Sequence, residues 1–317
     1  MAAKLSVLGN INIDFVMEAE RMPIPGETLI GSNLRFVPGG KAANQAVTAA
    51  RLGAHVTLIG SVGRDAYGPA LLENFEREGI NTEHVSRRRE ANTGAAFITL
   101  LPDGENSILS ILGANELITP DHVEKAAAAI ERTDMLLVQL AVPLEVVDRA
   151  IQVAVDRGVP VQLDPTPISR GLPKLWRRAY RMTPNEVEAA EIAKSPVSTP
   201  EEALDAARKI RRRGVKMPLI KLGRQGALLL DDQGPRLIEG YDVPVVDTTG
   251  AGDAFAAGLA VRCAEGASIN QAVAFANACG ALACMRFGAQ PSLPRREEVE
   301  GFLAERGGET SAVIRPL

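Results

Sequence analysis

The chain has 317 residues, with 35 lysines and arginines against 39 aspartates and glutamates and a formal net charge of −4. This length allows a large buried core in one α/β domain, with or without a small appendage. The slightly acidic balance argues against nucleic acid or an anionic membrane as a partner. We find no signal peptide, no apolar run of membrane-spanning length and no metal-like spacing among the three cysteines, so we expect a cytoplasmic protein.

The first strand is predicted at residues 5–9, and polar side chains follow it. Asn12 and Asp14 come just after this strand, where open α/β sheets place their ligands. From residue 15 to residue 36, short alternating runs are broken by prolines and a glycine, with no helical period. This segment therefore predicts strands of a small sheet that stands off the main body.

The rest of the chain alternates strands with helices. Further strands are predicted at 55–61, 95–101, 107–112, 135–140, 159–164, 181–183, 217–222 and 227–230. Helices are predicted at 42–52, 67–78, 119–130, 144–156, 199–213, 268–285 and 297–305, with another that opens at Asn185. Such alternation favours an α/β fold: a doubly wound, mainly parallel sheet flanked by helices on both faces.

Two patches break this alternation, at 12–39 and 92–112, and the second contains hairpin turn chemistry at 102–105. We expect them to form a small β-sheet lid over the carboxyl edge of a body made of residues 1–11, 40–91 and 113–310. Residues 311–317 are expected to form an extended tail. A lid would suit phosphoryl transfer, because water must be kept from the phosphate.

The strongest chemical signal is Asp-Thr-Thr-Gly-Ala-Gly-Asp at 247–253, which follows an extended run at 243–246 and opens a helix of small residues. The amide groups of Gly250, Ala251 and Gly252 at a helix N-terminus favour an anion. A carboxylate beside an anion site is explained if Asp253 takes a proton from a hydroxyl that attacks phosphorus. The alternative is a glycine-rich turn with Asp253 as an ordinary first-turn helix residue.

Lys41 and Asn44 follow two glycines and share one face of a predicted helix. With Asn12 and Asp14 they could bind a polyhydroxylated ligand, or the glycines could form only a turn and leave Lys41 in solvent. The glycine–lysine pair does not complete a Walker A loop, because an arginine and an alanine stand where that loop requires glycine and serine or threonine.

Asn185 and Glu188 open the next helix after a short strand. They share a face and could hold a hydrated Mg²⁺ near phosphates, although an N-capping asparagine with a first-turn acid explains them equally well. The turn from Gly223 to Gly226 is a candidate for the nucleotide side of a site, and is a weak signal alone.

Together, three motifs resemble the ribokinase (PfkB) family of sugar and nucleoside kinases, from residue 5 to about residue 304. They are Gly-Gly-Lys-Ala-Ala-Asn-Gln-Ala at 39–46, Thr-Pro-Asn-Glu-Val-Glu at 183–188 and Asp-Thr-Thr-Gly-Ala-Gly-Asp at 247–253, in the family's order and spacing. The resemblance implies a phosphotransferase with an alcohol acceptor, which uses ATP and Mg²⁺ and is activated by K⁺. The family's lid also serves as a dimer interface, so a homodimer is implied.

The resemblance implies a role for each matching residue. Asp253 would be the catalytic base, with Gly250, Ala251 and Gly252 as the anion hole. The residues implied for the sugar are Asn12, Asp14, Gly40, Lys41, Asn44 and Asp253. Those implied for ATP are Asn185, Lys221, Gly223, Gly226, Gly252 and Asn277, and Asn185 and Glu188 would organise Mg²⁺. Those implied for K⁺, mostly through backbone carbonyls, are Asp247, Thr249, Ala283, Arg286, Gly288 and Ser292.

Three positions depart from the family pattern. The family commonly has Gln-Leu-Glu where this chain has Gln-Leu-Ala at 139–141, and the glutamate missing at Ala141 would reach sugar hydroxyls. Losing such an acceptor typically costs about 1–3 kcal/mol. The other departures are milder: Ala42 stands in place of the usual glycine beside Lys41, and Lys221 stands where threonine is common.

We therefore expect a kinase that transfers phosphate from ATP to the 5-hydroxyl of D-ribose. A kinase for a nucleoside, a ketose or a keto-deoxy sugar acid is the alternative within the family. A nucleoside would need apolar cover from the lid, for which Phe15, Phe36 and Phe97 are candidates. A non-catalytic sugar-binding protein is the alternative from another class, and its signature would be loss of the base or the anion hole.

Overall fold

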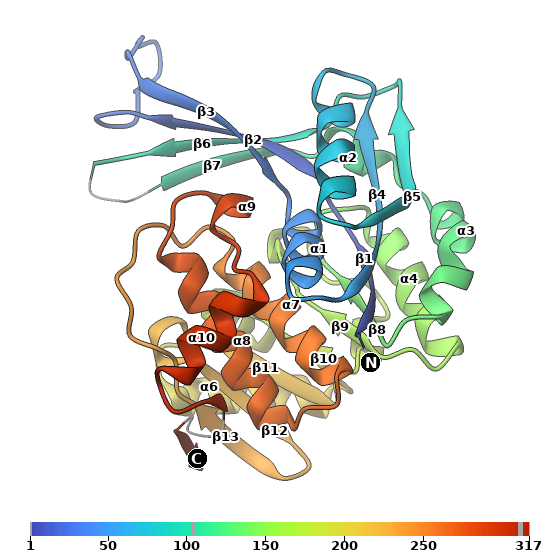
Figure 1. Ribbon diagram of the computed structural model, residues 1–317, viewed down its shortest axis with the longest axis vertical. Helices are drawn as coiled ribbons and strands as arrows, with labels where there is room; N and C mark the ends of the chain where they lie inside the picture. Colours follow the sequence, from blue (N-terminus) through green and yellow to red (C-terminus); the bar gives the residue numbers. More distant parts are fainter. Residues whose placement is uncertain (1, 103–105, 310–312, 317) are drawn as a thin grey trace.

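The computed structural model describes residues 2–102, 106–309 and 313–316. The chain forms two sheets, and Figure 1 shows the smaller one extending from the upper end of the body that surrounds the larger one. None of the described helices combines the length and the apolar character needed to cross a membrane.

Ten strands form the larger sheet. All neighbours among its seven strands on one side are parallel, and the other three add as antiparallel strands. The spatial order is β14 (Ile314–Pro316), β13 (Gly234–Ile238), β12 (Ala227–Asp231), β11 (Met217–Lys221), β10 (Arg181–Met182), β9 (Val161–Leu163), β8 (Met135–Val138), β1 (Lys4–Leu8), β4 (His55–Gly63) and β5 (Asn81–Arg88).

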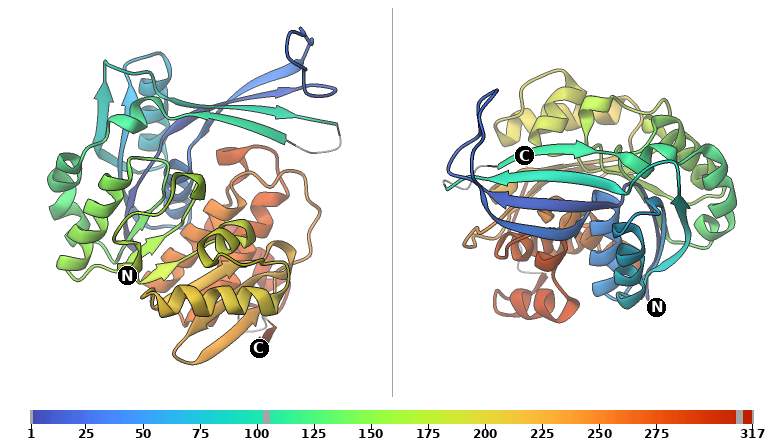
Figure 2. Two further views of the ribbon diagram at one scale, coloured as in Figure 1. Left: turned by 180° about the vertical axis from the view of Figure 1, so that it is seen from behind. Right: turned by 90° about the horizontal axis from the view of Figure 1, so that it is seen from above.

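Helices cover both faces of this sheet (Figures 1 and 2). One face carries α1 (Lys41–Arg51), α2 (Tyr67–Arg77), α7 (Ala251–Ala264), α8 (Ile269–Cys284) and α10 (Arg296–Ala304). The other face carries α3 (Pro120–Glu131), α4 (Leu144–Asp156), α5 (Glu186–Ala193) and α6 (Pro200–Arg212). Strand β8 shows the division: Met135 and Leu137 belong to the first hydrophobic cluster, and Leu136 and Val138 to the second. Burial on both faces explains why the central strands are continuous apolar runs.

Four strands form the smaller sheet, in the order β3 (Ser32–Gly39), β2 (Asn12–Glu18), β6 (Gly94–Leu100) and β7 (Asn106–Ile111). The central pair, β2 and β6, is parallel, and the two outer pairs are antiparallel. The short helix α9 (Ala289–Ser292) contacts β3 from the body.

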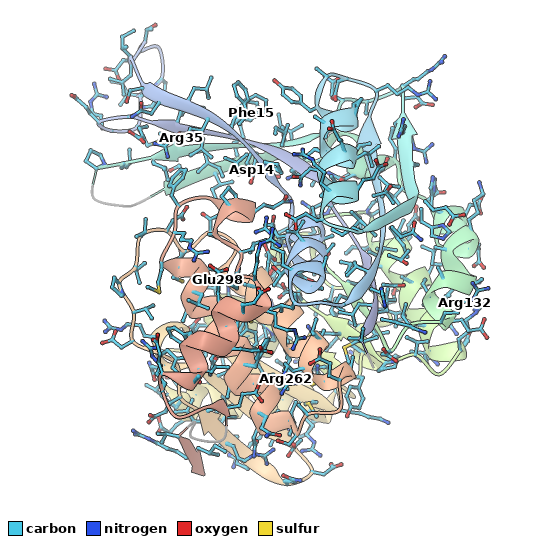
Figure 3. The ribbon with its side chains drawn as sticks, in the orientation of Figure 1. Asp14, Phe15, Arg35, Arg132, Arg262 and Glu298 are labelled. Carbon is cyan, nitrogen blue, oxygen red and sulfur yellow. The ribbon has the colours of Figure 1, made fainter. Side chains whose placement is uncertain are left out.

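The two faces of the smaller sheet differ in chemistry. Asp14 pairs with Ala96, and both line a cleft on the side of the body. In the next row Phe15 pairs with Phe36 and Phe97, with ring centroids 5.2 and 4.9 Å away. Because side chains alternate along a strand, these aromatic rings lie on the outer face, and Figure 3 shows Phe15 and Asp14 on opposite sides of the sheet.

The fold class predicted from the sequence is confirmed: a mainly parallel sheet flanked by helices, with a small separate sheet. The boundaries at 1–11, 40–91 and 113–310 for a body and at 12–39 and 92–112 for a lid stay predictions. The strands on either side of the expected hairpin turn pair antiparallel, and turn residues 103–105 lie outside the described part of the chain.

Parts of the larger sheet differ from the sequence pattern. The pattern predicts neither β5 nor β13, and β5 is an edge strand of mostly polar residues in which only Val85 is buried. Such a strand has no apolar alternation to detect. Within the expected tail, Ile314–Pro316 pair with β13 and complete the sheet. Residues 243–246, expected to be extended, form no strand.

Candidate active site

The glycine turn before α7 creates the first part of the site. Gly250 adopts a left-handed conformation with φ of 82°, which favours glycine, and the helix begins at the next residue. The carbonyl of Gly250 accepts the first helical bond from Ala254 at 2.8 Å. The Ala251 amide donates to the Thr248 carbonyl at 3.2 Å, which closes the turn. The N-terminus of α7, which is the positive end of the helix dipole, therefore faces the cleft.

Asp253 lies in the first turn of α7, and its carboxyl group is buried. Asn44 donates to Oδ2 at 2.9 Å and Gln45 donates to Oδ1 at 3.3 Å, both from α1. Burial raises the pKa of Asp253, the charge of Lys41 lowers it, and Asp164 raises it again, with a net increase. A carboxylate with a raised pKa that is held by neutral amides is suited to accept a proton.

A cleft of about 810 Å³ lies beneath the smaller sheet, at the carboxyl ends of the central strands. It brings together residues that are far apart in the sequence, as expected for an open α/β sheet. Of the predicted site residues, it is lined by Asn12, Asp14, Gly40, Lys41, Asn44, Asn185, Glu188, Lys221, Thr249, Gly250, Gly252 and Asp253.

Two buried acceptors in this cleft have no donor. Among the described residues, Oδ1 of Asp14 and Oδ1 of Asn44 have no hydrogen-bond partner. Burial, and then the charge of Asp253, raise the pKa of Asp14 to about 7, while Lys41 lowers it. Unpaired buried acceptors are costly, so the cleft suits a ligand that brings hydroxyl donors.

Asn12 is oriented by a residue that the sequence did not single out. Asn115 lies fully buried, accepts from the Ile11 amide at 2.9 Å and donates to Oδ1 of Asn12 at 3.0 Å. This hydrogen bond fixes the orientation of the Asn12 side-chain amide. The NH₂ group of this amide is left to donate to a ligand.

The glycine turn before α1 is required by close packing. Gly40 has φ of 93°, and a Cβ at this position would lie 2.7 Å from the Asn10 carbonyl oxygen. A Cβ at Gly39 would overlap the carboxyl group of Asp14 at 2.1 Å. The turn therefore both brings Lys41 to the cleft and leaves room for the carboxyl group of Asp14.

Asn185 and Glu188 form a reciprocal cap at the start of α5. Asn185 Oδ1 accepts from the Glu188 amide at 2.8 Å, and Glu188 Oε2 accepts from the Asn185 amide at 2.9 Å. The other oxygen of Glu188 accepts from the Thr166 hydroxyl. Asn185 and Glu188 therefore cap α5 and also line the cleft. The two interpretations from the sequence, helix capping and ligand binding, are compatible.

A second, narrower pocket of about 230 Å³ adjoins the cleft. Its walls include Gly223, Gly226, Ala251 and Asn277, and it shares Lys221, Thr248 and Gly252 with the cleft. The side chain of Asn277 donates to the carbonyls of residues 238 and 239 at 3.1 and 3.0 Å, so it also holds the loop that closes this pocket.

Asp247, which lines neither the cleft nor the narrower pocket, organises a third cluster that adjoins the cleft through Thr249. Its oxygens accept from the Thr249 amide at 2.9 Å, the Thr249 hydroxyl at 2.7 Å and the Gly288 amide at 2.9 Å. Ala283 lies in the last turn of α8, whose Cys284 carbonyl accepts from the Asp247 amide at 3.2 Å, and Ser292 donates to a carbonyl of α9 at 2.8 Å. Arg286 points to an ion pair with Glu298, so only its backbone is available here.

Asp164, Gln45 and Thr166 belong to the site although the sequence analysis passed over them. Lys221 pairs with Asp164 at 3.0 Å, and Gln45 donates to the other oxygen of Asp164 at 3.0 Å. Asp164 ends a predicted strand, and the reasoning applied to Asn12 would have found it. Ala141 also lines the cleft, so a glutamate at this position would reach into it.

The proposed cover for a nucleoside base is absent from the cleft. Phe15, Phe36 and Phe97 lie on the outer face of the smaller sheet, and none of them lines the cleft. The apolar residues that the strands of the smaller sheet contribute to the cleft are Ala96, Ile98 and Ile108.

Comparison with known proteins agrees with this geometry. A family model described as pfkB family carbohydrate kinase matches residues 2–296. A ribokinase from Haemophilus influenzae is 38% identical over 303 residues, which cover 96% of this chain and 99% of that protein. The crystal structure of a ribokinase from Thermotoga maritima matches with a TM-score of 0.87 and 34% identity, over 96% of this chain and 100% of that one.

The structure of a ribokinase from Arabidopsis thaliana, complexed with ribose and ATP, matches with a TM-score of 0.86 and 33% identity, over 94% of this chain and 98% of that one. The resemblance inferred from the three motifs is thus confirmed over nearly the full length. This chain belongs to the pfkB family of carbohydrate kinases, which are phosphotransferases with an alcohol group as acceptor.

Proposed function

We propose that this protein transfers the γ-phosphate of ATP to the 5-hydroxyl of D-ribose. The observation that carries the proposal is the buried carboxyl group of Asp253, held by two amides beside the glycine turn of α7 and facing a cleft with unpaired acceptors. The relatives named ribokinase, and the one whose structure contains ribose and ATP, are similar to this chain over nearly their whole length.

In the proposed step the 5-hydroxyl oxygen bonds to the γ-phosphorus while the bond from phosphorus to the β-phosphate oxygen breaks. The leaving oxygen keeps the electron pair, and Asp253 accepts the hydroxyl proton. Amides of Gly250, Ala251 and Gly252 stabilise the charge on the phosphoryl oxygens. The Ala251 amide can do so only by sharing its proton with the turn bond to Thr248.

The sugar is bound by Asn12, Asp14, Gly40, Lys41 and Asn44. Asp14 and Asn44 supply the unpaired acceptors for sugar hydroxyls, and Asn12 and Lys41 supply donors. The adenine and ribose of ATP occupy the narrower pocket between Gly223 and Asn277. The phosphates then lie toward Gly252 and Lys221, which belong to both cavities.

Asn185 and Glu188 fit a hydrated Mg²⁺ better than a directly bound one. Each oxygen of Glu188 already accepts one hydrogen bond and keeps a second lone pair. No group of three or more acidic, histidine or cysteine side chains in the described residues could hold a metal ion. These residues would therefore hold Mg²⁺ through water and phosphate oxygens, and the ion would neutralise phosphate charge.

K⁺ is proposed at the cluster around Asp247, with Thr249, Ala283, Arg286, Gly288 and Ser292. The carboxylate of Asp247 supplies one formal charge, and the C-terminal end of α8 adds carbonyl oxygens at the negative end of its dipole. Because the cluster adjoins the turn at 248–250, an ion there would hold the anion hole in position.

A homodimer through the smaller sheet is the last part of the proposal. The outer face carries Phe36 and Leu109, which are 53% and 66% exposed, in the same row as Phe15 and Phe97. A continuous apolar row of this kind on a free surface suggests an interface.

The test is ATP consumption by the purified protein with Mg²⁺ and K⁺ across ribose, other pentoses, hexoses, keto-deoxy acids and nucleosides. Saturable turnover that is best on ribose supports the proposal. A clear preference for another compound would keep the reaction and reassign the substrate, and no turnover on any compound would favour a sugar-binding protein. Replacing K⁺ by a large organic cation should lower kcat, and full activity without K⁺ would contradict the proposed K⁺ site.

A further inference from the structure

Lys221 lies where the two cavities meet. Its side chain is 14% exposed and lines both the cleft and the narrower pocket. A Cβ built on Gly252 would lie 3.4 Å from Nζ of Lys221, so the ammonium group faces the glycine turn of α7. A cation at this junction adjoins the amides of the proposed anion hole.

Asp164 holds this ammonium group. Its Oδ1 accepts from Lys221 at 3.0 Å, and its Oδ2 accepts from Gln45 at 3.0 Å. Each carboxylate oxygen is thus held by a residue of a different element, Lys221 of β11 and Gln45 of α1. Burial acts to lower the pKa of Lys221, but Asp164 and then Glu188 and Asp253 outweigh it and raise the pKa, so the group stays charged.

The ammonium group of Lys221 has further N–H donors available for a ligand. It carries three N–H groups, and among the described residues only Asp164 accepts a hydrogen bond from this ammonium group. The remaining two can reach a ligand in either cavity. The Lys221–Asp164 pair is close to neutral as a unit, so Lys221 contributes directed hydrogen bonds more than net charge.

We propose that Lys221 donates to the γ-phosphate of ATP and that Asp164 is a positioning residue that fixes the ammonium group for this contact. The proposal rests on the proposed ATP-dependent kinase activity and deepens it. Lys221, at the end of β11, would then bind the phosphoryl group, while Lys41, at the start of α1, remains a donor to the sugar.

The decisive measurement is direct nucleotide binding by calorimetry, with Mg²⁺, using ADP and a non-hydrolysable ATP analogue. Lys221→Met should weaken the analogue about 10- to 100-fold, the range for a charged hydrogen bond, and ADP by less than about 3-fold. Equal weakening of both nucleotides, or of neither, would overturn the contact with the γ-phosphate. Because binding is measured without a sugar, this result does not depend on whether ribose is the substrate.

Lys221→Met leaves the carboxylate of Asp164 buried without a cation, which could prevent folding. The double variant Lys221→Met/Asp164→Asn removes that charge and should show the same selective loss. Asp231→Asn is the matched control: Asp231 pairs with Arg236 at 2.7 Å, with side chains 12% and 11% exposed, and neither lines the two cavities. It should leave both nucleotide affinities unchanged.

The positioning role of Asp164 has its own readout. Asp164→Asn should lower kcat about tenfold and change ADP affinity by less than about 3-fold. In the Lys221→Met background the same change should have little further effect on kcat, because it acts through Lys221. Additive losses in kcat would show that Asp164 acts by another route and would overturn this part of the proposal.

Discussion

The carboxyl group of Asp253 is bound by amide groups from one helix and belongs to another. Asn44 and Gln45 fix both of its oxygens, and Lys41 acts on it through charge without a hydrogen bond in the described structure. A cation in direct contact would make this carboxylate a weaker base. The two neutral amides weaken it less. This arrangement explains how one residue can be both buried and reactive.

Replacing this base tests its role directly. Asp253→Asn keeps the size and both amide neighbours, so ribose affinity by calorimetry should change by only a few-fold. The value of kcat should fall by about 10²- to 10⁴-fold, the usual contribution of general-base catalysis. A variant that retains more than about a tenth of the wild-type kcat would disprove the assignment.

At Ala141, in the proposed sugar cleft, the chain departs from the family pattern, which has glutamate there. A glutamate there has open space in a cavity of about 810 Å³ and would supply a charged acceptor. Ala141→Glu should lower KM for ribose by about 5- to 150-fold, as expected for about 1–3 kcal/mol, with little change in kcat. Ala141→Gln has the same size without the charge, so an equal gain for both variants would attribute the effect to packing.

Asp14 couples stability to pH. Its pKa is raised from 3.8 to about 7 in the folded protein, chiefly by burial. Between these values the unfolded chain has lost a proton that the folded chain keeps, so the free energy of unfolding falls as pH rises through this window. Asp14→Asn removes this penalty.

The variant's melting temperature should therefore exceed that of the wild type by a margin that grows from about pH 4 to pH 7 and is constant above it. Thermal unfolding without sugar, at intervals across this range, measures the margin. A margin that is independent of pH would show that Asp14 is ionised throughout.

At the scale of elements, β14 is one of the strands that the sequence pattern did not reveal. It pairs with β13 at the edge of the larger sheet, and Arg315 forms an ion pair with Glu239. Neither strand lines the cleft or the narrower pocket. A chain that ends at residue 309 keeps the ion pair between Glu309 and Arg262 and loses β14 together with its ion pair to Glu239.

This truncation should lower the melting temperature by about 2–5 °C and leave kcat and KM unchanged. It also exposes β13 as an unpaired edge, so aggregation on heating should begin earlier, as light scattering would show. An unchanged melting temperature would mean that β14 adds nothing to the stability of the sheet. A changed KM would mean that it acts on the site.

At the scale of the whole molecule, the outer face of the smaller sheet is the surface most suited to a second copy of the chain. Phe97→Asp places a charge in the middle of the aromatic row. Sedimentation should then show the chain mass of 33.7 kDa in place of twice that value. Val187→Asp is the matched control, because Val187 is an exposed apolar residue on α5, 73% exposed, far from this sheet in the chain.

A wild-type protein that sediments as a monomer would contradict the proposed homodimer. If the smaller sheet closes the cleft only within a dimer, Phe97→Asp should also raise KM for ribose, whereas Val187→Asp should not. An unchanged KM in a monomeric variant would separate assembly from closure.

Local sequence determined much of this protein. Apolar runs such as 135–138 and capping signals such as Thr199 with Pro200 depend on neighbouring residues alone, and the elements they predict are present. The glycine turns at 39–40 and 250–252 could also be predicted, because each contains one position, Gly40 or Gly250, whose positive φ value excludes most other residues. The three motifs together identified the family, since their order and spacing have no simpler explanation.

Only the tertiary structure decided the rest. The strands β5 and β14 depend on partners far along the chain, and their own residues carry no apolar period. The pairing of Lys221 with Asp164, and the contact of Asn115 with Asn12, join residues 57 and 103 positions apart. The sequence by itself determined which chemical groups are present and which turns the backbone makes, because these are local properties. The structure decided which groups meet, which side of the small sheet faces the cleft and which charges are buried together, because these depend on packing between distant segments.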